Sequence, residues 1–272
     1  MFTIRGAAAL GAAMLALSTA TAFAQSASQE RKEIKKYQRM TAENSPVDLW
    51  VLEGEDLWKK KRGPNNVSLE RCDLGMGPGV TKGAYAHLPR YFKDTNRVQD
   101  LESRLVTCMT TLQGFTEKEA TKRVFGNADK PSDMEYLAAY VASRSRGIRM
   151  QVSTRNPKAK ASYELGRALF HYRAGSWDFS CASCHGTPGK RIRMQALPVL
   201  SSKAGARGTY TTWPGYRVSN SQLKTMQWRI NDCFRQQRFP EPNYGSDATV
   251  ALTMYMAVNA NGAIYRGPGT KR

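Results

Sequence analysis

The chain has 272 residues, of which 41% are hydrophobic and 23% are charged, and its formal net charge is +19. This composition supplies enough apolar residues for a folded core, so it excludes a disordered polyelectrolyte. Beyond the N-terminal segment the sequence has no apolar run long enough to span a bilayer, which excludes a multi-pass membrane protein.

The first 24 residues have the pattern of a secretory signal peptide. An apolar run from Ala7 to Ala24 follows Arg5, contains no acidic residue, and ends in Ala22-Phe23-Ala24 before a polar stretch. Segments of this kind are removed on export. We therefore expect residues 1–24 to be cleaved and the mature protein to be periplasmic, where disulfides are permitted.

The excess of basic residues predicts an anionic ligand or partner. Export makes nucleic acid a poor candidate, and the sequence contains no helix-turn-helix, zinc-finger or RNA-binding signature. We expect no nucleic-acid partner and no membrane span. Five basic residues surround one acidic residue between Trp213 and Pro240, a local excess that suits a small dianion: Arg217, Lys224, Arg229, Arg235 and Arg238.

A short helix is predicted over Tyr163–Tyr172, with Leu165, Leu169 and Tyr172 on one face. Gly166 and Phe170 of this helix resemble the glycine and aromatic pair on the first helix of c-type cytochromes.

Residues 181–185 read Cys-Ala-Ser-Cys-His, the haem c attachment sequence C-x-x-C-H. Cys181 and Cys184 are spaced to bond the two vinyl groups of one porphyrin, and His185 would place its ring over the iron. A zinc site would need a second Cys/His pair at similar spacing. A thioredoxin-like dithiol would lie in a βαβ pattern. The sequence has neither, so we expect covalent haem c with His185 as an axial ligand.

The second iron ligand is expected on a helix that starts at Ser219-Asn220-Ser221 and ends before Pro240. Its apolar face would carry Leu223, Met226, Ile230 and Cys233. Methionine is the usual ligand in an electron carrier, whereas a cysteine on an apolar face is usually buried and inert. This helix alone leaves Met226 and Cys233 open as ligands.

A last helix is predicted from Ser246 to Asn261, with Ser246 as its N-cap and Gly262 beyond its end. A helix, a haem sequence and a last helix in this order resemble a cytochrome c domain, which we place at residues 155–272.

The first half of the mature chain repeats these landmarks. Gly54–Trp58 matches Gly166–Phe170, and Cys72 follows Gly54 at the spacing at which Cys184 follows Gly166. Near the end of the half, Ser132 and Glu135 form a capping box at a position matching Ser246. We therefore expect an all-α protein of two cytochrome c-like domains in tandem, at residues 25–150 and 155–272.

The first copy has lost its haem sequence, because Leu69–Asp73 contains Cys72 but neither the first cysteine nor the histidine. Arg104–Cys108 matches Arg229–Cys233, while Met226 has no methionine counterpart. This match favours Cys233 as the second iron ligand. With no haem between them, Cys72 and Cys108 would face a shared core, and we expect a disulfide there.

Together these features closely resemble the A subunits of the SoxAX cytochromes of periplasmic thiosulfate oxidation. The resemblance rests on the degenerate first unit, on Cys181–His185, and on Trp228–Cys233 ahead of Phe239-Pro240. It implies an L-cysteine S-thiosulfotransferase that conjugates thiosulfate oxidatively to a cysteine of a carrier protein and passes electrons through haem c. It also implies two partners, a small SoxX-like cytochrome subunit and a SoxYZ-like carrier complex.

The resemblance assigns roles to two more residues. Cys233 would be both an axial iron ligand and the persulfide-bearing catalytic thiolate, and Arg229 would bind the substrate. Because Arg229 lies one helical turn before Cys233, we expect its charge to keep the thiol deprotonated.

Many members of this family carry a second haem in the first unit. This sequence departs from them there, so we expect one haem c. Two alternatives stay open, a simple periplasmic electron carrier and a thiosulfate dehydrogenase that forms tetrathionate. His87 and His171 receive no role.

Overall fold

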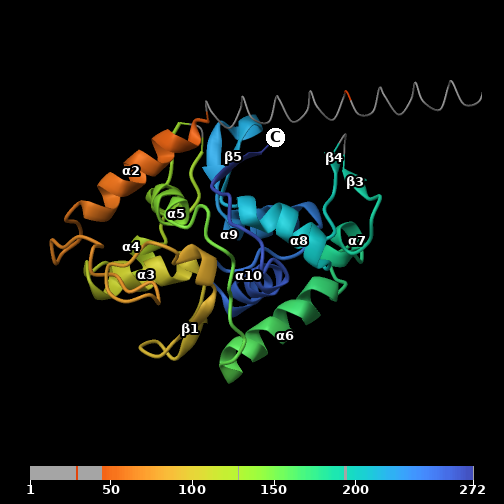
Figure 1. The fold of residues 1–272 in the computed structure, drawn as a ribbon, viewed down its shortest axis with the longest axis horizontal. Helices are drawn as coiled ribbons and strands as arrows, with labels where there is room; N and C mark the ends of the chain where they lie inside the picture. Colours follow the sequence, from red (N-terminus) through yellow and green to blue (C-terminus); the bar gives the residue numbers. More distant parts are fainter. Residues whose placement is uncertain (1–28, 30–44, 128, 193–194, 272) are drawn as a thin grey trace, which may run out of the picture. The chain divides into compact units, whose positions relative to one another are not determined.

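Helices joined by short strands and tight turns build the chain (Figure 1). The structure is a computed structural model that describes residues 29, 45–127, 129–192 and 195–271. The expected signal peptide at residues 1–24 lies outside the described residues. Residues Pro46–Arg272 form one compact unit. We call residues 45–150 the first half and residues 155–271 the second half.

The helices of the first half are α2 (Val47–Lys59), α3 (Leu101–Thr111), α4 (Glu117–Ala120) and α5 (Asp133–Ser143). Those of the second half are α6 (Pro157–His171), α7 (Cys181–His185), α8 (Lys203–Thr209), α9 (Met226–Gln236) and α10 (Asp247–Asn259). No helix among the described residues is long and apolar enough to cross a membrane.

The all-α expectation is incomplete, because short strands accompany these helices. They are β1 (Arg90–Phe92), β2 (Arg97–Gln99), β3 (Arg191–Ile192), β4 (Gln195–Ala196), β5 (Gly215–Arg217), β6 (Gln222–Lys224) and β7 (Gly269–Lys271). The first six pair antiparallel as three hairpins, and β7 adds to β5 in parallel. Strands of two or three residues are too short to leave an alternating pattern in the sequence.

Several helix ends follow from their capping residues. Ser246 caps α10 by accepting a hydrogen bond from the Thr249 amide, and Ser132 and Glu135 form the expected capping box on α5. Helix α6 begins earlier than expected because Asn156 caps it and Pro157 occupies its first turn.

The start of α9 differs from the expectation. Thr225, and not the segment at Ser219, is the N-cap, because its side chain accepts a hydrogen bond from the Trp228 amide. Leu223 lies instead in strand β6, fully buried. A hairpin that turns at Ser221, whose φ is 50°, separates the two candidate starts.

The sequence repeat is also a repeat of packing. Helix α2 lies against α5, and α6 lies against α10 (Figure 1). A Cβ atom on Gly54 would lie 2.0 Å from the Tyr136 carbonyl oxygen, and one on Gly166 would lie 1.9 Å from that of Ala251. Each half therefore needs a glycine at the point where its first helix crosses its last helix.

A second repeated segment leads into α3 and α9. In each half a 3₁₀ turn, Tyr85–His87 or Tyr210–Thr212, is followed by a cis X-Pro bond, a hairpin and then the helix. The hairpins are β1–β2 and β5–β6. Cys108 on α3 and Cys233 on α9 therefore occupy equivalent positions in the two halves.

Candidate functional site

The C-x-x-C-H sequence forms its own short helix, α7. Ser180 caps it and exchanges hydrogen bonds with Ser183, which fixes the first turn. At the other end, the His185 Nδ1 atom lies 2.8 Å from the Pro198 carbonyl oxygen. This contact orients the ring with Nδ1 as donor and leaves Nε2 as the nitrogen that can bind a metal. Burial lowers the pKa of His185, which favours the neutral imidazole that a metal requires.

Three half-buried free thiols meet here, Cys181 and Cys184 on α7 and Cys233 on α9. Burial, together with the neighbouring Cys233 and Cys184 thiols, raises the pKa of Cys181 to about 12. The Cys184 thiol in turn contributes to raising the pKa of Cys233. The fold therefore brings Cys233 close to the haem attachment sequence, although the two segments are far apart along the chain.

Arg229 is fixed on the turn of α9 that precedes Cys233. Its Nη1 atom donates a 2.8 Å hydrogen bond to the Asp232 carboxylate, which also accepts from Arg235 and Gln236. The guanidinium is largely but not fully buried, with 24% of the side chain exposed. It also contributes to lowering the pKa of His185, so its charge reaches the imidazole as well as the thiol.

Opposing effects act on the pKa of Cys233, and its deprotonation by Arg229 stays a prediction. Burial raises the pKa of Cys233, and the charges of Arg229 and Arg217 offset only part of that effect. Burial in a low-dielectric environment penalises the charged thiolate, whereas the two guanidinium groups stabilise it.

The five basic residues between Trp213 and Pro240 have different surroundings in the structure. Arg217, which lies over the Trp228 ring at 5.6 Å, joins Arg229 in acting on Cys233. Lys224 is instead buried in an ion pair with Glu135, Arg235 is exposed on Asp232, and Arg238 lies over Trp177. Sequence spacing could not separate these roles, and no local signal pointed to the Pro198 carbonyl.

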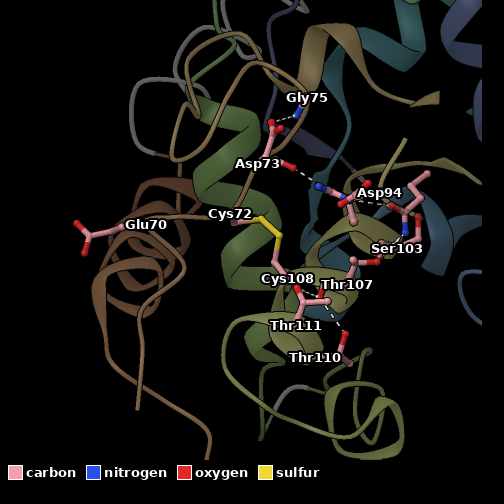
Figure 2. Close-up of a disulfide and its surroundings, with 12 residues drawn as sticks. Glu70, Cys72, Asp73, Gly75, Asp94, Ser103, Thr107, Cys108, Thr110 and Thr111 are labelled. Carbon is pink, nitrogen blue, oxygen red and sulfur yellow. Dashed lines mark hydrogen bonds and ion pairs between the residues drawn. A yellow bond between two sulfur atoms is a disulfide. The ribbon is translucent and has the colours of Figure 1, made fainter. Parts of the chain in front are cut away.

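In the first half the same positions are occupied by a different network. Cys72 and Cys108 form a disulfide with Cα atoms 5.6 Å apart, the pairing expected from the sequence. Figure 2 shows this bond joining the Cys72 segment to α3, with Asp73 beside it. Both cysteines are buried.

Asp73 stands where the second half has His185. One of its carboxylate oxygens accepts hydrogen bonds from the Gly75 and Gly77 amides, so it folds the local turn. Arg104, the counterpart of Arg229, is buried and donates from Nε to the Asp73 carbonyl and from Nη1 to Asp94. These groups therefore bind one another within the part of the chain that the structure describes.

The two unassigned histidines make local contacts. The His87 Nδ1 atom lies 2.9 Å from the Gly83 carbonyl oxygen, and the His171 Nδ1 atom lies 2.9 Å from that of Arg167. Each of these contacts spans four residues of one turn.

The donor set of the second half fits a haem c. It offers two thiols in C-x-x-C-H spacing, an imidazole whose Nδ1 is already engaged, and a further thiol on α9 that interacts electrostatically with the first two. These are the groups that attach haem c and bind its iron on both faces.

Fold and site together define a c-type cytochrome built from two cytochrome c-like units. The family model for the SoxA/TsdA cytochrome c domain matches residues 53–150 and 165–264. The two matched segments confirm the prediction of two cytochrome c-like domains, and a cytochrome c domain implies that the chain binds haem c. The chain belongs to the SoxA family.

Similar proteins agree. The L-cysteine S-thiosulfotransferase subunit SoxA of Hydrogenophilus thermoluteolus is 53% identical over 241 residues, covering 89% of this chain and 88% of that protein. A SoxA subunit of Hydrogenobacter thermophilus is 37% identical over 245 residues and covers 89% of each. The crystal structure of SoxXA from P. pantotrophus matches with a TM-score of 0.71 at 27% identity, covering 87% of this chain and 84% of that chain.

Proposed function

We propose that this chain is the catalytic haem subunit of an L-cysteine S-thiosulfotransferase that conjugates thiosulfate to a cysteine of a carrier protein. The observation that carries the proposal is the position of Cys233 and Arg229 on α9 beside the C-x-x-C-H helix. A simple electron carrier needs no such pairing of a nucleophilic sulfur with a cation, so this arrangement favours the enzyme.

One haem c is held by the second half. Cys181 and Cys184 would attach it through thioether bonds, and the His185 Nε2 atom and the Cys233 sulfur would bind its iron. When bound, the haem accepts electrons one at a time, and the anionic thiolate donor lowers its reduction potential. The first half carries no haem, because Cys72 and Cys108 are joined to each other and Asp73 replaces the histidine.

The reaction forms one sulfur–sulfur bond. The carrier thiol and thiosulfate combine into a cysteine S-thiosulfonate, with release of one proton and of two electrons that haem c would accept. In this chain the persulfide of Cys233 would first form the bond to thiosulfate with loss of the two electrons. Attack of the carrier thiol on the bound sulfur would then release the Cys233 persulfide and the proton. Arg229 binds the sulfonate oxygens through charge-assisted hydrogen bonds.

The same proposal covers location and partners. Residues 1–24 direct export to the periplasm, and the domains extend over residues 25–150 and 155–272. A small SoxX-like cytochrome forms a heterodimer with this chain, in keeping with the similarity to SoxXA. A SoxYZ-like complex supplies the carrier cysteine.

The test replaces Cys233 with methionine and uses Met226→Leu as the matched control on the same helix. We expect Cys233→Met to keep covalent haem, to change the haem spectrum, and to lose conjugation of thiosulfate to the carrier, measured by intact mass of the carrier. Met226→Leu should change neither the haem spectrum nor the conjugation of thiosulfate, because Met226 is not the iron ligand in this proposal. Part of the native chain should be heavier by one sulfur at Cys233.

Full conjugation by the Cys233→Met variant would remove Cys233 from the mechanism and restore the electron-carrier interpretation. Tetrathionate as the product, with the carrier unmodified, would instead support a thiosulfate dehydrogenase.

A further inference from the structure

The first half contains a cavity of about 450 Å³ that the proposed reaction does not use. It lies among α3, the α4 segment and the start of α5. Ten residues line it: Arg62, Met109, Phe115, Glu119, Ala120, Lys122, Arg123, Lys130, Asp133 and Met134. Its size falls in the range of sites for small organic ligands.

The lining is divided between apolar and cationic groups. Met109 and Met134 are buried and Phe115 is half-buried, whereas Lys122, Arg123 and Lys130 are exposed. The two acidic residues of the lining are already engaged. Asp133 accepts from Arg62, and Glu119 accepts from the Thr116 amide and hydroxyl. The cavity therefore presents an apolar floor and a net positive rim.

Arg62 lies where these two parts meet. Its Nη2 atom donates to Asp133 at 2.6 Å, and its guanidinium lies 5.8 Å from the centre of the Phe115 ring. Its Nη1 atom is buried and has no hydrogen-bond partner in the part of the chain that the structure describes. Because a water-sized molecule does not reach this nitrogen, a ligand in the cavity would meet Arg62 through the 19% of its side chain that is exposed.

Two features of this cavity differ between the halves of the chain. The bridge between Arg62 and Val67 corresponds to the bridge between Ala174 and Phe179, so the second half has alanine in place of the guanidinium. Most of the lining residues come from residues 115–127 and 129–131, between α3 and α5, and this connection is much longer than the one between α9 and α10. The first half therefore has a cation and a long lining segment that differ from those of the second half.

We propose that this cavity binds a small organic carboxylate. The carboxylate pairs with the exposed part of the Arg62 guanidinium and with the rim lysines, while the apolar body of the ligand packs on Met109, Phe115 and Met134. A guanidinium pairs well with a carboxylate, and the apolar floor favours a ligand with a hydrocarbon or aromatic body over an inorganic anion.

Isothermal titration calorimetry of the holoprotein with benzoate tests the proposal, with benzyl alcohol and sulfate as comparison probes. We expect benzoate to bind about tenfold more tightly than either probe, because each lacks one of the two recognised parts. Arg62→Gln should weaken benzoate binding about tenfold. Failure of benzoate to bind, or sulfate binding as tightly as benzoate, would overturn the proposal.

A second pair of variants keeps the test informative if Arg62→Gln fails to fold. Lys122→Gln with Lys130→Gln removes two rim charges and should weaken benzoate binding several-fold. Lys82→Gln with Lys160→Gln removes the same charge from exposed lysines outside the cavity and should leave binding unchanged. Equal effects of the two pairs would reduce the binding to general attraction by the basic surface and would contradict the proposed site.

Discussion

At the scale of single residues, the site depends on how Asp232 arranges its neighbours. This carboxylate accepts from Arg229, Arg235 and Gln236, and its own side chain is only 10% exposed. It ties Arg229 to the turn of α9 that carries Cys233. Arg235 lies on the same carboxylate but is 62% exposed. Arg229 and Arg235 therefore share one carboxylate partner but differ in how far their side chains are exposed to solvent.

This difference gives a controlled test of substrate binding. Replacing Arg229 by alanine should lower thiosulfate turnover roughly ten- to a hundred-fold, the equivalent of about 1.5 to 3 kcal/mol lost from hydrogen bonds to a charged group. The haem spectrum should stay nearly unchanged, because Arg229 does not bind iron. Arg235→Ala should have little effect, since an exposed ion pair contributes little. Steady-state kinetics over a range of thiosulfate concentrations measures the turnover of both variants. An equal loss of turnover in the two would contradict a binding role for Arg229.

The sequence identified the thiols of the site but not the groups that hold them. C-x-x-C-H and the Arg229–Cys233 spacing are local patterns, so they could be recognised without a structure. The hydrogen bond from His185 to the Pro198 carbonyl and the closure of Arg104 onto Asp73 are contacts between distant segments. The pKa of Cys233 depends on how deeply the fold buries the thiol, and a sequence pattern does not give that depth.

At the scale of elements, the first and last helices of each half cross at a glycine with very close backbone contact. Gly166 on α6 and Gly54 on α2 have no room for a side chain against the carbonyl oxygens of Ala251 and Tyr136. Aromatic pairs flank both crossings, Phe170 with Tyr255 and Trp58 with Tyr140. The glycine and aromatic pair could be recognised in the sequence because it recurs at fixed spacing, whereas its role in the helix crossing became visible only in the structure. The hairpins before α3 and α9 could not be recognised, because they are too short to show a period.

Alanine at these glycines should force the helices apart. We expect Gly166→Ala and Gly54→Ala each to lower the free energy of unfolding by about 1 to 3 kcal/mol or more, as overpacking does. Gly166→Ala should also reduce haem incorporation, whereas Gly54→Ala should not. Gly208→Ala in α8 is the control, because a Cβ atom there would enter open space and the change should be neutral or stabilising. Chemical denaturation followed by circular dichroism measures all three, and a neutral Gly166→Ala would contradict the close crossing.

The disulfide gives a prediction for the first half. Cys72–Cys108 closes a loop with a sequence separation of 36 residues. Replacing both cysteines by alanine should cost about 3 to 4 kcal/mol of stability by the chain-entropy model. Haem content and thiosulfate turnover of the folded fraction should not change, because the buried bond lies outside the reacting groups. Denaturation of the double variant gives the stability, and a loss of turnover by fully folded protein would indicate that the disulfide has a redox role.

At the scale of the whole molecule, polar contacts join the two halves around the start of α9. Lys224 pairs with Glu135 of α5 at 2.9 Å, with both side chains buried. Glu102 of α3 accepts from the Gln227 amide and from the Tyr244 hydroxyl. Because these contacts fix the strand and the first turn that lead to Arg229 and Cys233, the first half supports the position of the site.

The buried Glu102 carboxyl predicts how the stability contributed by these contacts between the halves depends on pH. Burial, and then the nearby Asp100, raise the pKa of Glu102 well above its usual range. Between the unfolded and folded pKa values the folded state binds the extra proton, so this group's contribution to stability falls as pH rises through that window. In the Glu102→Gln variant the side chain is neutral at every pH, like protonated glutamate, so its contribution to stability does not fall as pH rises. Relative to the native protein, the variant should be similar in stability at about pH 4.5 and should become more stable as pH rises toward 8.

Urea denaturation at a series of pH values measures the difference between the two proteins. Glu55→Gln serves as the control of opposite sign. Its hydrogen bond and ion pair with Lys59 lower the pKa of Glu55, so this contribution is present above the unfolded pKa and is lost as pH falls. The Glu55 variant should therefore gain nothing as pH rises. If the stability of Glu102→Gln followed the same pH dependence as that of the native protein, Glu102 would be ionised in the folded state over the whole pH range measured. The contacts between the two halves would then include a buried negative charge.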